Sequence, residues 1–555
     1  MRPSPRSLLC GAVTIGVIVG NTPLASPAPS PSLTRAGVDT LSWSICPAES
    51  ERDTGFGLPR ADVLCASVHV PVHHDDPGGR TVGIEVRKIT ATGERTGTVF
   101  GNPGGPGGDA RDMWYSALDG DDDAAIDEVR RDHDLVIVQP RGLEGAGALE
   151  CLPEDGLEGE NAPVLALRCM NTDREFVSTI TTENLVRDHE LVRQLMGLDR
   201  INYLGYSYGT AIGMMYQTLF PDSIERMVLD SAVGPTDTWW YELHLRQAQN
   251  RYQARNYVLE WIAEHDDAFE LGDTPLEVYR EIHQLDLSEG AAASRFLPPP
   301  AGPDDDLVGS LPVPSSSVGS VDGANTGSAR LDNFAAASSG VFDRDVDGAV
   351  GYFMILDESS TSPAEWPAIA WAISAKVHGT LPDPPSPEAL AAALAEESDQ
   401  PAVTSDMETY LTILNCNETA PTVGTPLAPV LLGSSESVGS THEEIWGLTE
   451  QVPYCLYPPS TVPHEIQANP MAARPLVIQA DHDPQTPAIF GPSTAAATGG
   501  TLVRVRGTVH GQFDSGNEAV DEIVLRYLKT GQVEPDQHLD TPRPLPGTPP
   551  WARAE

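Results

Sequence analysis

The fold of this 555-residue chain is decided by the stretch Asn202-Tyr203-Leu204-Gly205-Tyr206-Ser207-Tyr208-Gly209-Thr210. Its centre has the pattern Gly-x-Ser-x-Gly, which places Ser207 on a sharp turn between a strand and a helix, and the two glycines let neighbouring backbone pass close to that turn. Residues 201–204 form a β-prone run before it, and residues 211–220 carry apolar side chains at helical spacing until Pro221. We therefore expect a strand, a tight turn and a helix, with the Ser207 hydroxyl presented at the turn.

Further β-prone or buried runs alternate with helical patterns along the chain. The expected strands are residues 63–72, 81–89, 98–100, 135–138, 226–230, 475–480 and 501–505, the first two as an antiparallel pair. The clearest expected helices are residues 181–196, 211–220 and 520–528. Strands that alternate with helices form a mostly parallel sheet with covered faces, and active sites collect at the carboxyl ends of such strands.

A glycine-rich loop, Gly101-Asn102-Pro103-Gly104-Gly105-Pro106-Gly107-Gly108, follows the expected strand at 98–100. Such a loop exposes backbone N–H groups with no side chain in the way, which is what an oxyanion hole requires. It is not a P-loop, because no Gly-Lys-Ser/Thr closes it. We expect the oxyanion donors to be the N–H of Tyr208 and the N–H of Gly104 or Gly105.

A serine hydroxyl becomes a nucleophile when an imidazole takes its proton and a carboxylate orients that imidazole. Asp483 and His510 each follow an expected strand, and the chain order is Ser207, Asp483, His510. That order is expected of an α/β-hydrolase fold. Asp481 is the competing acid, and Asp483 is preferred because Asp-Pro starts a turn that can point its carboxylate inward.

The composition changes after about residue 233. Helical stretches rich in Trp, Tyr and Gln run over residues 239–263, and residues 286–339 are rich in Pro, Ser and Gly. We interpret this part as a helical cap inserted into the sheet domain, where it would set substrate choice. The expected division is a signal peptide at 1–30, the first part of the core at 40–232, the cap at 233–465 with a low-complexity loop at 286–339, the second part of the core at 466–532, and a Pro-rich, poorly ordered tail at 533–555.

The N-terminus predicts export. Arg2 and Arg6 precede an apolar run at residues 8–19 and a Pro-rich run of small residues, which is the layout of a secretory signal. The apolar run is shorter than the about 18 to 20 residues of a membrane span. Removal of the signal leaves six of the seven cysteines, an even number in an oxidising compartment. Their order along the chain favours the local disulfides Cys46 with Cys65, Cys151 with Cys169, and Cys416 with Cys455.

The chain is strongly acidic. Its formal net charge is −46, from 34 Lys and Arg against 80 Asp and Glu. Such acidity repels nucleic acid and anionic lipid, so we expect no nucleic-acid partner and no stable membrane association. The cysteines lack metal-site spacing, and hydrolysis needs no organic group, so we expect no metal and no cofactor. The expected protein is a secreted, extracellular monomer.

Together these motifs resemble the secreted tripeptidyl aminopeptidase and proline iminopeptidase family of α/β-hydrolases, in particular its actinobacterial tripeptidyl aminopeptidase branch. The resemblance extends from about Trp43 to Leu528 and rests on residues 102–107, 140–142, 203–210, 483–487 and 509–511. The chain departs from the family at Gln139, where Asp is common before Pro-Arg-Gly, and at Val509, where Gly is common before the histidine.

The resemblance implies a serine exopeptidase that removes short peptides, with tripeptides expected first, or single residues from a free N-terminus. In such enzymes acidic residues on the cap side receive the ammonium group of the substrate. The segment 413–418 looks like the family's cysteine followed two residues later by an acid, so Glu418 is the candidate substrate-binding residue. The alternative for Glu418 is a solvated charge beside a disulfide.

Two other functions stay open from the sequence. The same three groups cleave esters, and a fold does not set the substrate, so a secreted esterase or lactonase is the main alternative. A binding module without catalysis is the third hypothesis, and it conflicts with the complete set of Ser207, Asp483, His510 and the glycine-rich loop. Undiminished biological activity of a Ser207→Ala variant would support that third hypothesis.

Overall fold

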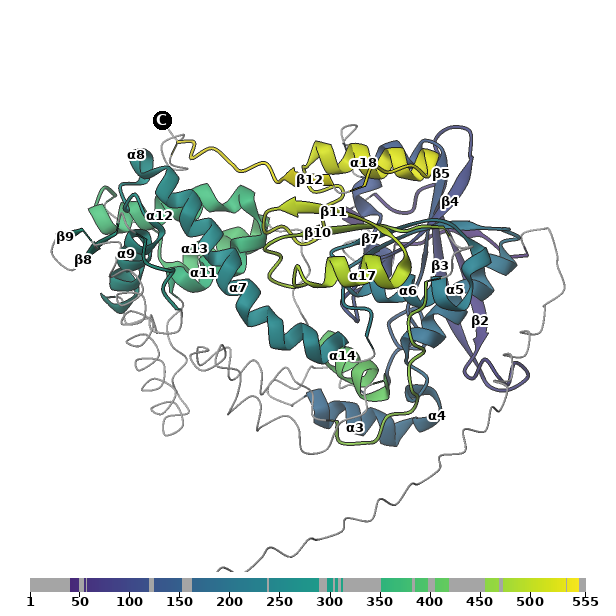
Figure 1. Cartoon of the computed structure of the whole chain (residues 1–555). Coiled ribbons are helices and arrows are strands. Elements are labelled where there is room, and N and C mark those ends of the chain that lie inside the picture. The colour runs from purple at the N-terminus through teal and green to yellow at the C-terminus, as the bar shows by residue number, and fades with distance from the viewer. Residues whose placement is uncertain are drawn as a thin grey trace, which may run out of the picture.

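A ten-stranded sheet lies at the centre of the molecule (Figure 1). The computed structural model describes residues 40–48, 54–55, 57–118, 124–151, 162–236, 239–288, 297–302, 305–307, 311–312, 351–381, 385–397, 405–418, 455–468, 473–535 and 537–548. The expected signal peptide and most of the stretch 286–339 lie outside these residues. The strands of the sheet are β1 (Ser44–Ile45), β2 (Val63–Pro71), β3 (Thr81–Ile89), β4 (Gly97–Asn102), β5 (His133–Val138), β6 (Ile201–Tyr206), β7 (Ile224–Asp230), β10 (Leu476–Ala480), β11 (Thr501–Arg506) and β12 (Gln537–Asp540).

The strand order explains why distant parts of the chain meet. It runs β1-β2-β3-β5-β4-β6-β7-β10-β11-β12. The pairs from β1 to β5 are antiparallel, and every further pair, from β5–β4 to β11–β12, is parallel. The predicted mostly parallel sheet with an antiparallel beginning is therefore confirmed. Because β4, β6, β7, β10 and β11 run in one direction, the residues that follow them meet at one edge of the sheet.

Side chains that alternate along the strands enter two apolar clusters, one on each face of the sheet. On β5, Val136 and Val138 belong to one cluster, and Leu135 and Ile137 belong to the other. Burial on both faces makes such strands nearly continuous apolar runs, which is why they could be recognised in the sequence. The first cluster includes side chains of α3 (Ala162–Thr172), α4 (Arg174–Val177), α5 (Thr182–Leu195), α6 (Tyr208–Leu219) and α17 (Phe490–Thr498), and the second those of α2 (Ala125–Arg130) and α18 (Glu518–Thr530). Short 3-10 helices are η1 (Ala110–Asp112), η2 (Tyr115–Leu118), η3 (Pro221–Ser223), η5 (Ser359–Thr361) and η6 (Pro363–Glu365).

A third apolar cluster lies to one side of the sheet and is built by helices of the inserted part (Figure 1). Its helices are α7 (Trp239–Glu264), α8 (Asp266–Phe269), α9 (Pro275–Ser288), α11 (Tyr352–Glu358), α12 (Trp366–His378) and α13 (Pro387–Glu397), with the short strands β8 (Asp306–Leu307) and β9 (Leu311–Pro312) nearby. At its centre the Trp261 ring lies 5.4 Å from that of Phe269 and 5.7 Å from that of Trp366, centroid to centroid. In the part of the chain that the structure describes, no helix is long and apolar enough to cross a bilayer.

One helix of the inserted part packs on the core instead. α14 (Ser405–Glu418) lies against α3, and its Tyr410 and Ile413 belong to the cluster that surrounds α6. The Tyr410 hydroxyl donates to Arg141 O at 3.2 Å, and its ring lies against Gly107 of the glycine-rich loop, 3.2 Å from the position of a Cβ atom there. The insertion therefore supplies a helix to the core as well as the separate cap cluster.

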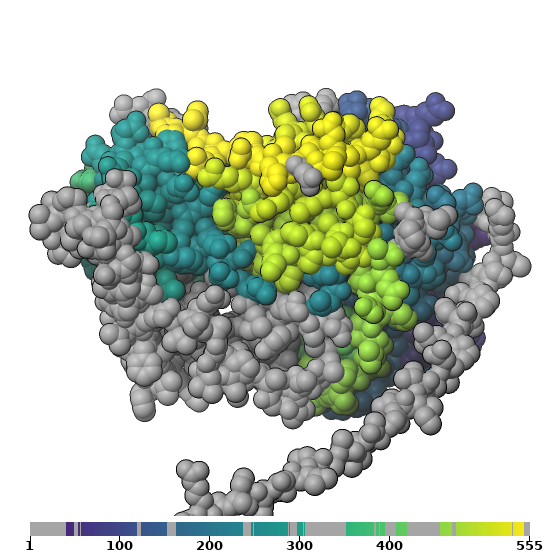
Figure 2. Space-filling view, in the orientation of Figure 1, coloured from purple at the N-terminus to yellow at the C-terminus, as the bar shows by residue number. Residues whose placement is uncertain are grey.

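The C-terminal segment corrects one expectation. Residues from 533 onward were expected to be poorly ordered, whereas Gln537–Asp540 forms β12 and pairs with β11 at the edge of the sheet. The chain then reaches the cap, where Trp261 Nε1 donates to Pro544 O at 2.9 Å and Trp371 Nε1 donates to Pro546 O at 2.8 Å. Figure 2 shows this yellow segment lying on the teal cap helices. Strand pairing and the two indole donors order a stretch whose own composition does not predict order.

Truncation after Glu534 is expected to lower the Tm more than truncation after Thr548. The shorter chain loses the β12 pairing and both indole hydrogen bonds, whereas the longer chain keeps every described contact of the segment. Each hydrogen bond contributes about 1 kcal/mol, so a loss of roughly 5 °C is expected. Calorimetry of both truncated proteins beside the full chain measures the difference. Equal Tm values for the two truncated chains would show that the segment does not tie the cap to the core.

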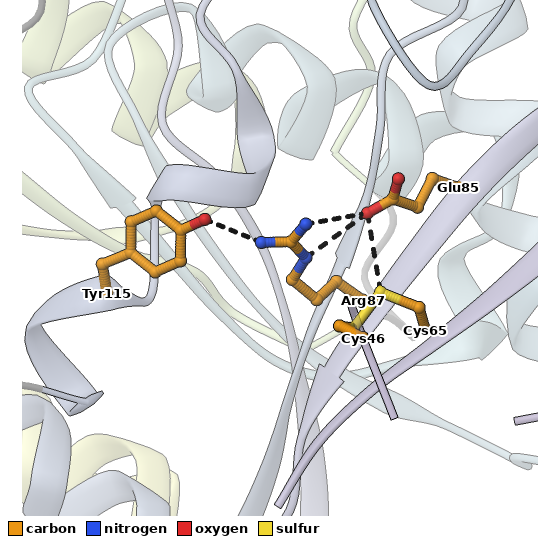
Figure 3. Close-up of a disulfide and its surroundings, with 5 residues drawn as sticks. All are labelled: Cys46, Cys65, Glu85, Arg87 and Tyr115. Carbon is orange, nitrogen blue, oxygen red and sulfur yellow. Dashed lines mark hydrogen bonds and ion pairs between the residues drawn. A yellow bond between two sulfur atoms is a disulfide. The ribbon is translucent and has the colours of Figure 1, made fainter. Parts of the chain in front are cut away.

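Three disulfides join the cysteines in the pairs expected from their order in the chain, Cys46–Cys65, Cys151–Cys169 and Cys416–Cys455. Figure 3 shows the first of them beside Glu85, Arg87 and Tyr115. Arg87 Nη2 donates to Glu85 Oε1 at 3.1 Å, and Arg87 Nη1 donates to the Tyr115 hydroxyl at 2.7 Å. Arg87 is only 3% exposed, and these partners offset the free energy of burying its charge.

Candidate active site

Ser207 occupies the turn between β6 and α6. Strand β6 is buried as far as Gly205, and α6 begins at Tyr208 with Ser207 as its N-cap. Ser207 has φ 52° and ψ −123°, a conformation with positive φ that residues other than glycine rarely adopt. Its N–H donates at 3.0 Å to the carbonyl oxygen of Asp230 on the neighbouring strand β7. A strained serine at a strand-to-helix turn is the geometry that the Gly-x-Ser-x-Gly pattern predicts.

Both glycines of that pattern are required by close backbone contacts. A Cβ atom at Gly205 would lie 2.4 Å from Gly209 O, and a Cβ atom at Gly209 would lie 2.4 Å from Asn102 O. Either side chain would push α6 or the end of β4 away from the turn. The pattern therefore reflects how tightly β4, β6 and α6 pack around Ser207.

The glycine-rich loop follows β4 and lies directly against this turn. A Cβ atom at Gly104, where φ is +102°, would lie 2.9 Å from Ser207 Cβ and 3.1 Å from Tyr208 N. Asn102 Oδ1 accepts the N–H of Gly104 at 3.0 Å, so this amide is already engaged. Of the two glycines expected as donors, Gly105 is therefore the candidate that remains beside the N–H of Tyr208.

Gly104→Ala is expected to lower kcat roughly a hundredfold, the cost of misplacing one oxyanion donor. The added methyl group would collide with Tyr206 O at 2.7 Å and with Ser207 Cβ at 2.9 Å. Gly57→Ala is the matched control, since Gly57 also has a positive φ, +69°, but has no atom within 4 Å of the added Cβ. Both variants place a side chain at positive φ, at about 1 kcal/mol, but only Gly104→Ala disturbs the turn. Wild-type kcat in Gly104→Ala would exclude the loop from the site.

Asp483 and His510 follow β10 and β11 and lie in contact. Asp483 Oδ2 and His510 Nδ1 are 2.9 Å apart, and Asp483 is fully buried while the His510 side chain is 15% exposed. Asp483 Oδ1 accepts the N–H of Gln485 at 2.8 Å and that of Thr486 at 2.9 Å. The Thr486 hydroxyl donates to Asp483 Oδ2 at 2.7 Å. These donors fix the carboxylate against the imidazole.

The competing acid, Asp481, is engaged elsewhere. Its Oδ1 accepts a hydrogen bond of 2.9 Å from Nε of Arg504 on the adjacent strand β11. Of the two acids, the structure thus brings Asp483 to His510. Thr486 had not been singled out from the sequence, although a hydroxyl three residues after an Asp that starts a turn is a recognisable signal.

The surroundings of His510 favour its protonated form. Burial lowers the pKa of His510, but the charge and hydrogen bond of Asp483 and the charge of Asp230 act in the opposite direction, and the resulting pKa is raised. A more basic imidazole accepts a hydroxyl proton more readily. Activity that needs neutral His510 should therefore rise with pH through a value above the usual about 6.5.

A second carboxyl group lies beside this pair and was missed in the sequence. Asp230 is the last residue of β7 and is fully buried, and its Oδ2 accepts the N–H of Gln512 at 2.9 Å and that of Phe513 at 2.8 Å. The position of Asp230 directly after the buried run 227–229 is the sequence feature from which it could have been predicted. The same criterion had selected Asp483 and His510.

Glu418, the candidate receptor of the substrate's ammonium group, ends α14 and is 8% exposed. Its Oε2 accepts from Thr182 Oγ1 at 3.1 Å, and its Oε1 accepts the N–H of Thr182 at the start of α5. The Thr182 and Tyr208 hydroxyls are 2.8 Å apart, which connects Glu418 to the residue after Ser207. Glu418 also lines a pocket beside α6, together with Thr182, Met214, Met215, Pro235 and His464. The alternative of a solvated charge is wrong, because the carboxyl group is buried.

Two family models match the chain. Residues 98–314 match one described as alpha/beta hydrolase fold, and residues 448–539 match one described as TAP-like protein. The first range contains the glycine-rich loop and Ser207, and the second contains Asp483 and His510. The matches therefore cover the segments that carry the nucleophile, the acid and the base, whereas Glu418 lies between the two matched ranges.

The chain is also similar to known proteins. It is 33% identical over 291 residues to a tripeptidyl aminopeptidase of Streptomyces lividans, a match that covers 48% of this chain and 51% of that one, about half the length of that relative. It is 26% identical to serine protease Hip1 of Mycobacterium tuberculosis, over 89% of this chain and 90% of that one. It is 26% identical to carboxylesterase B of the same species, over 96% and 97%.

The strand order of the sheet and the serine turn indicate the same fold as the two family models and the similar hydrolases. The parallel strands place the glycine-rich loop, Ser207, Asp483 and His510 at one edge of the sheet. The order of the last three along the chain, Ser, Asp, His, is that of the α/β-hydrolase fold. The chain has the α/β-hydrolase fold, and its sequence is similar to those of the Streptomyces tripeptidyl aminopeptidase and of serine protease Hip1.

Proposed function

We propose that the protein is an exported serine exopeptidase that releases short peptides from free N-termini, with tripeptides as the preferred product. The observation that carries the proposal is the Asp483–His510 pair, with 2.9 Å between Oδ2 and Nδ1, at the same edge of the sheet as the Ser207 turn. Similarity to a tripeptidyl aminopeptidase over half its length and to a serine protease over most of the chain supports peptides as the substrate class.

In the proposed mechanism Ser207 Oγ attacks the scissile carbonyl carbon while His510 takes the hydroxyl proton. Asp483 keeps Nδ1 of the imidazole protonated and stabilises the imidazolium. The N–H groups of Tyr208 and Gly105 bind the oxyanion. His510 then protonates the leaving amine, the C–N bond breaks, and water hydrolyses the Ser207 ester with His510 again as base.

Contacts between the cap and the loop that carries Asp483 support a role of the cap in substrate choice. From α7, Asn250 Nδ2 donates to Asp483 O at 2.8 Å, and Gln247 Nε2 donates to Gln485 O at 2.9 Å. A movement of α7 would therefore also move the backbone of Asp483, whose carboxylate orients His510.

The three disulfides support export, because such bonds persist in oxidising compartments.

Release of a chromogenic amine from matched peptides tests the proposal. The substrates carry one, two or three residues before the reporter, each with a free or an acetylated N-terminus, and Ser207→Ala is the control. We expect the free tripeptide to have the highest kcat/KM and acetylation to lower that value at least about tenfold, the worth of one charge-assisted hydrogen bond. Equal cleavage of free and acetylated peptides would exclude an exopeptidase, and cleavage of no peptide would exclude a peptidase.

Glu418 predicts a pH dependence of that preference. Burial raises the pKa of Glu418 to about 7, although the hydrogen bonds from Thr182 lower it. The carboxyl group is therefore ionised above this value and neutral below it, and binding of an ammonium group needs the ionised form. We expect the KM of the free tripeptide to fall several-fold as the pH rises from about 6 to about 7.5, while the KM of the acetylated peptide stays constant. Glu418→Gln should abolish the difference, and an unchanged KM and preference in that variant would exclude the role.

Similarity to carboxylesterase B over nearly the whole chain favours one second candidate function, an exported esterase. The same acyl-enzyme chemistry cleaves esters that carry no amine. Hydrolysis of p-nitrophenyl acyl esters that is lost in Ser207→Ala, with no cleavage of any peptide in the series, would establish the esterase and leave the catalytic groups unchanged.

A further inference from the structure

Asp230 contacts both halves of the candidate site. Its backbone carbonyl oxygen accepts the N–H of Ser207 at 3.0 Å. Its carboxylate accepts the N–H of Gln512 at 2.9 Å and that of Phe513 at 2.8 Å, the second and third residues after His510. The end of β7 is therefore bonded to the nucleophile turn on one side and to the segment 510–513, the His510 loop, on the other.

Ser231 extends the same connection. Its hydroxyl donates to Asp230 Oδ1 at 3.2 Å and accepts the N–H of Gly511 at 2.8 Å, while its own N–H donates to Ile478 O at 2.9 Å. Ser231 has φ 54°, a conformation that non-glycine residues keep only where surrounding contacts hold it. Three consecutive amides after His510 are thus bound by Asp230 and Ser231.

The carboxyl group of Asp230 has few charged neighbours. It is fully buried, and in the described part of the chain no lysine or arginine forms an ion pair with it. The titratable groups that face it are His510 from the loop after β11 and Tyr206 from β6. Burial raises the pKa of Asp230 to about 6, although the amides of Phe513 and Gln512, the Ser231 hydroxyl and His510 lower it. Burying a carboxyl group without a cation costs free energy, which the contacts with the His510 loop offset.

We propose that Asp230 is a positioning residue that holds His510 at the Ser207 turn through the backbone of the His510 loop. The proposal rests on the proposed serine hydrolase mechanism. Asp483 sets the tautomer and rotation of the imidazole, whereas Asp230 sets where the loop that carries the imidazole lies. A displacement of about 1 Å between reacting groups costs roughly a hundredfold in rate. The three amide hydrogen bonds that fix the His510 loop can therefore change the rate of the reaction by keeping the imidazole in place.

Asp230→Asn tests the proposal. The amide keeps the size of the side chain but places an NH₂ group where both carboxylate oxygens now accept hydrogen bonds. We expect kcat to fall about ten- to a hundredfold with KM within about twofold of wild type, because Asp230 is fully buried and offers no surface to the peptide. Loss of the negative charge also removes one group that raises the pKa of His510. The acidic limb of kcat/KM should therefore move to lower pH.

Asp286→Asn is the matched control. Asp286 is also a buried carboxyl group, 2% exposed, and accepts two backbone N–H groups, of Tyr352 at 2.8 Å and of Phe353 at 3.2 Å. It lies in α9 of the cap and binds the first residues of α11, far from the His510 loop in the chain. We expect a lower Tm in this variant with unchanged kcat and an unchanged acidic limb. If both variants showed the same kinetic changes, the loss in Asp230→Asn would reflect only a general loss of stability, and the proposal would be overturned.

A fluorophosphonate probe separates this proposal from the proposed function. Its phosphorus is attacked by Ser207 Oγ, fluoride leaves, and the rate depends on His510 but not on peptide recognition. If the wild type reacts with the probe but cleaves no peptide, the exopeptidase proposal fails, and slow labelling of Asp230→Asn would still support the positioning role. Wild-type labelling rates and an unchanged acidic limb in Asp230→Asn would overturn it.

Ser231→Ala provides a second variant if Asp230→Asn does not fold. It removes one of the three amide contacts, that of Gly511, and leaves the carboxylate of Asp230 in place. We expect a roughly three- to tenfold lower labelling rate with an unchanged acidic limb, because the loop is less well held while the charge near His510 is kept. A labelling rate equal to that of wild type would count against the positioning role.

Discussion

Ser207→Ala is expected to lower kcat roughly a millionfold, to the level that binding and oxyanion stabilisation alone support. Alanine has no Oγ with which to form the acyl-enzyme, while the backbone of the turn, with φ 52°, is unchanged. Initial rates on the free tripeptide substrate, measured at high enzyme concentration, give the size of the loss. The Tm of the variant should stay close to that of wild type, since the Ser207 side chain is not part of either apolar cluster.

The double variant Ser207→Ala/His510→Ala is the control for this prediction. His510→Ala alone should cost about as much as Ser207→Ala, and the double variant should be no slower than either single variant, because both groups act in one proton transfer. If the two losses multiplied instead, Ser207 and His510 would act independently. That outcome would contradict the proposed mechanism.

Asp483→Asn is expected to have the largest effect after the loss of Ser207 or His510, a roughly ten-thousandfold lower kcat. The Asn amide would still fill the site but would stabilise the wrong tautomer of His510, whose Nδ1 now lies 2.9 Å from Asp483 Oδ2. Thr486 would keep its place, because the backbone amides that bind Asp483 Oδ1 can also bind the Asn side-chain oxygen. Single-turnover rates with a chromogenic ester measure the chemical step directly.

Asp481→Asn is the matched control, two residues away in the same loop. Asp481 is bound to Arg504 of β11, whose side chain is 43% exposed, and it does not pair with His510, so we expect kcat within about twofold of wild type. A large loss in Asp481→Asn with a small loss in Asp483→Asn would reverse the assignment of the acid.

Most of the sheet could be predicted because parallel strands buried on both faces are nearly continuous apolar runs. Residues 135–138 lie in β5, and the expected strand 475–480 is β10 from Leu476 onward, with every residue of both strands buried. β12 could not be predicted in this way. Its sequence Gln-His-Leu-Asp is polar and stands in a Pro-rich segment, and it becomes a strand because β11 offers an unpaired edge.

The candidate site was predicted in part. Gly-x-Ser-x-Gly predicted the Ser207 turn, although only Gly205 is crowded from within the turn, by Gly209 O, whereas Gly209 is crowded by Asn102 O at the end of β4. The choice between Gly104 and Gly105 depended on the side chain of Asn102, which accepts one of the two amides. The choice between Asp481 and Asp483 depended on which neighbour each carboxylate meets, and preference for a turn at Asp-Pro favoured Asp483 without settling it.

Patterns read from the sequence alone therefore determined the fold class, the strands that carry the site, the serine turn and the disulfide pairs. Each of these depends on local propensity, on burial or on order along the chain. Only the tertiary structure decided the engagement of Gly104, the pairing of Asp483 with His510, the burial of Glu418 and the contacts of Asp230 with the His510 loop. These involve groups far apart in sequence, as Asp230 and Phe513 are, and such contacts depend on how whole strands lie side by side, which no short stretch of sequence encodes.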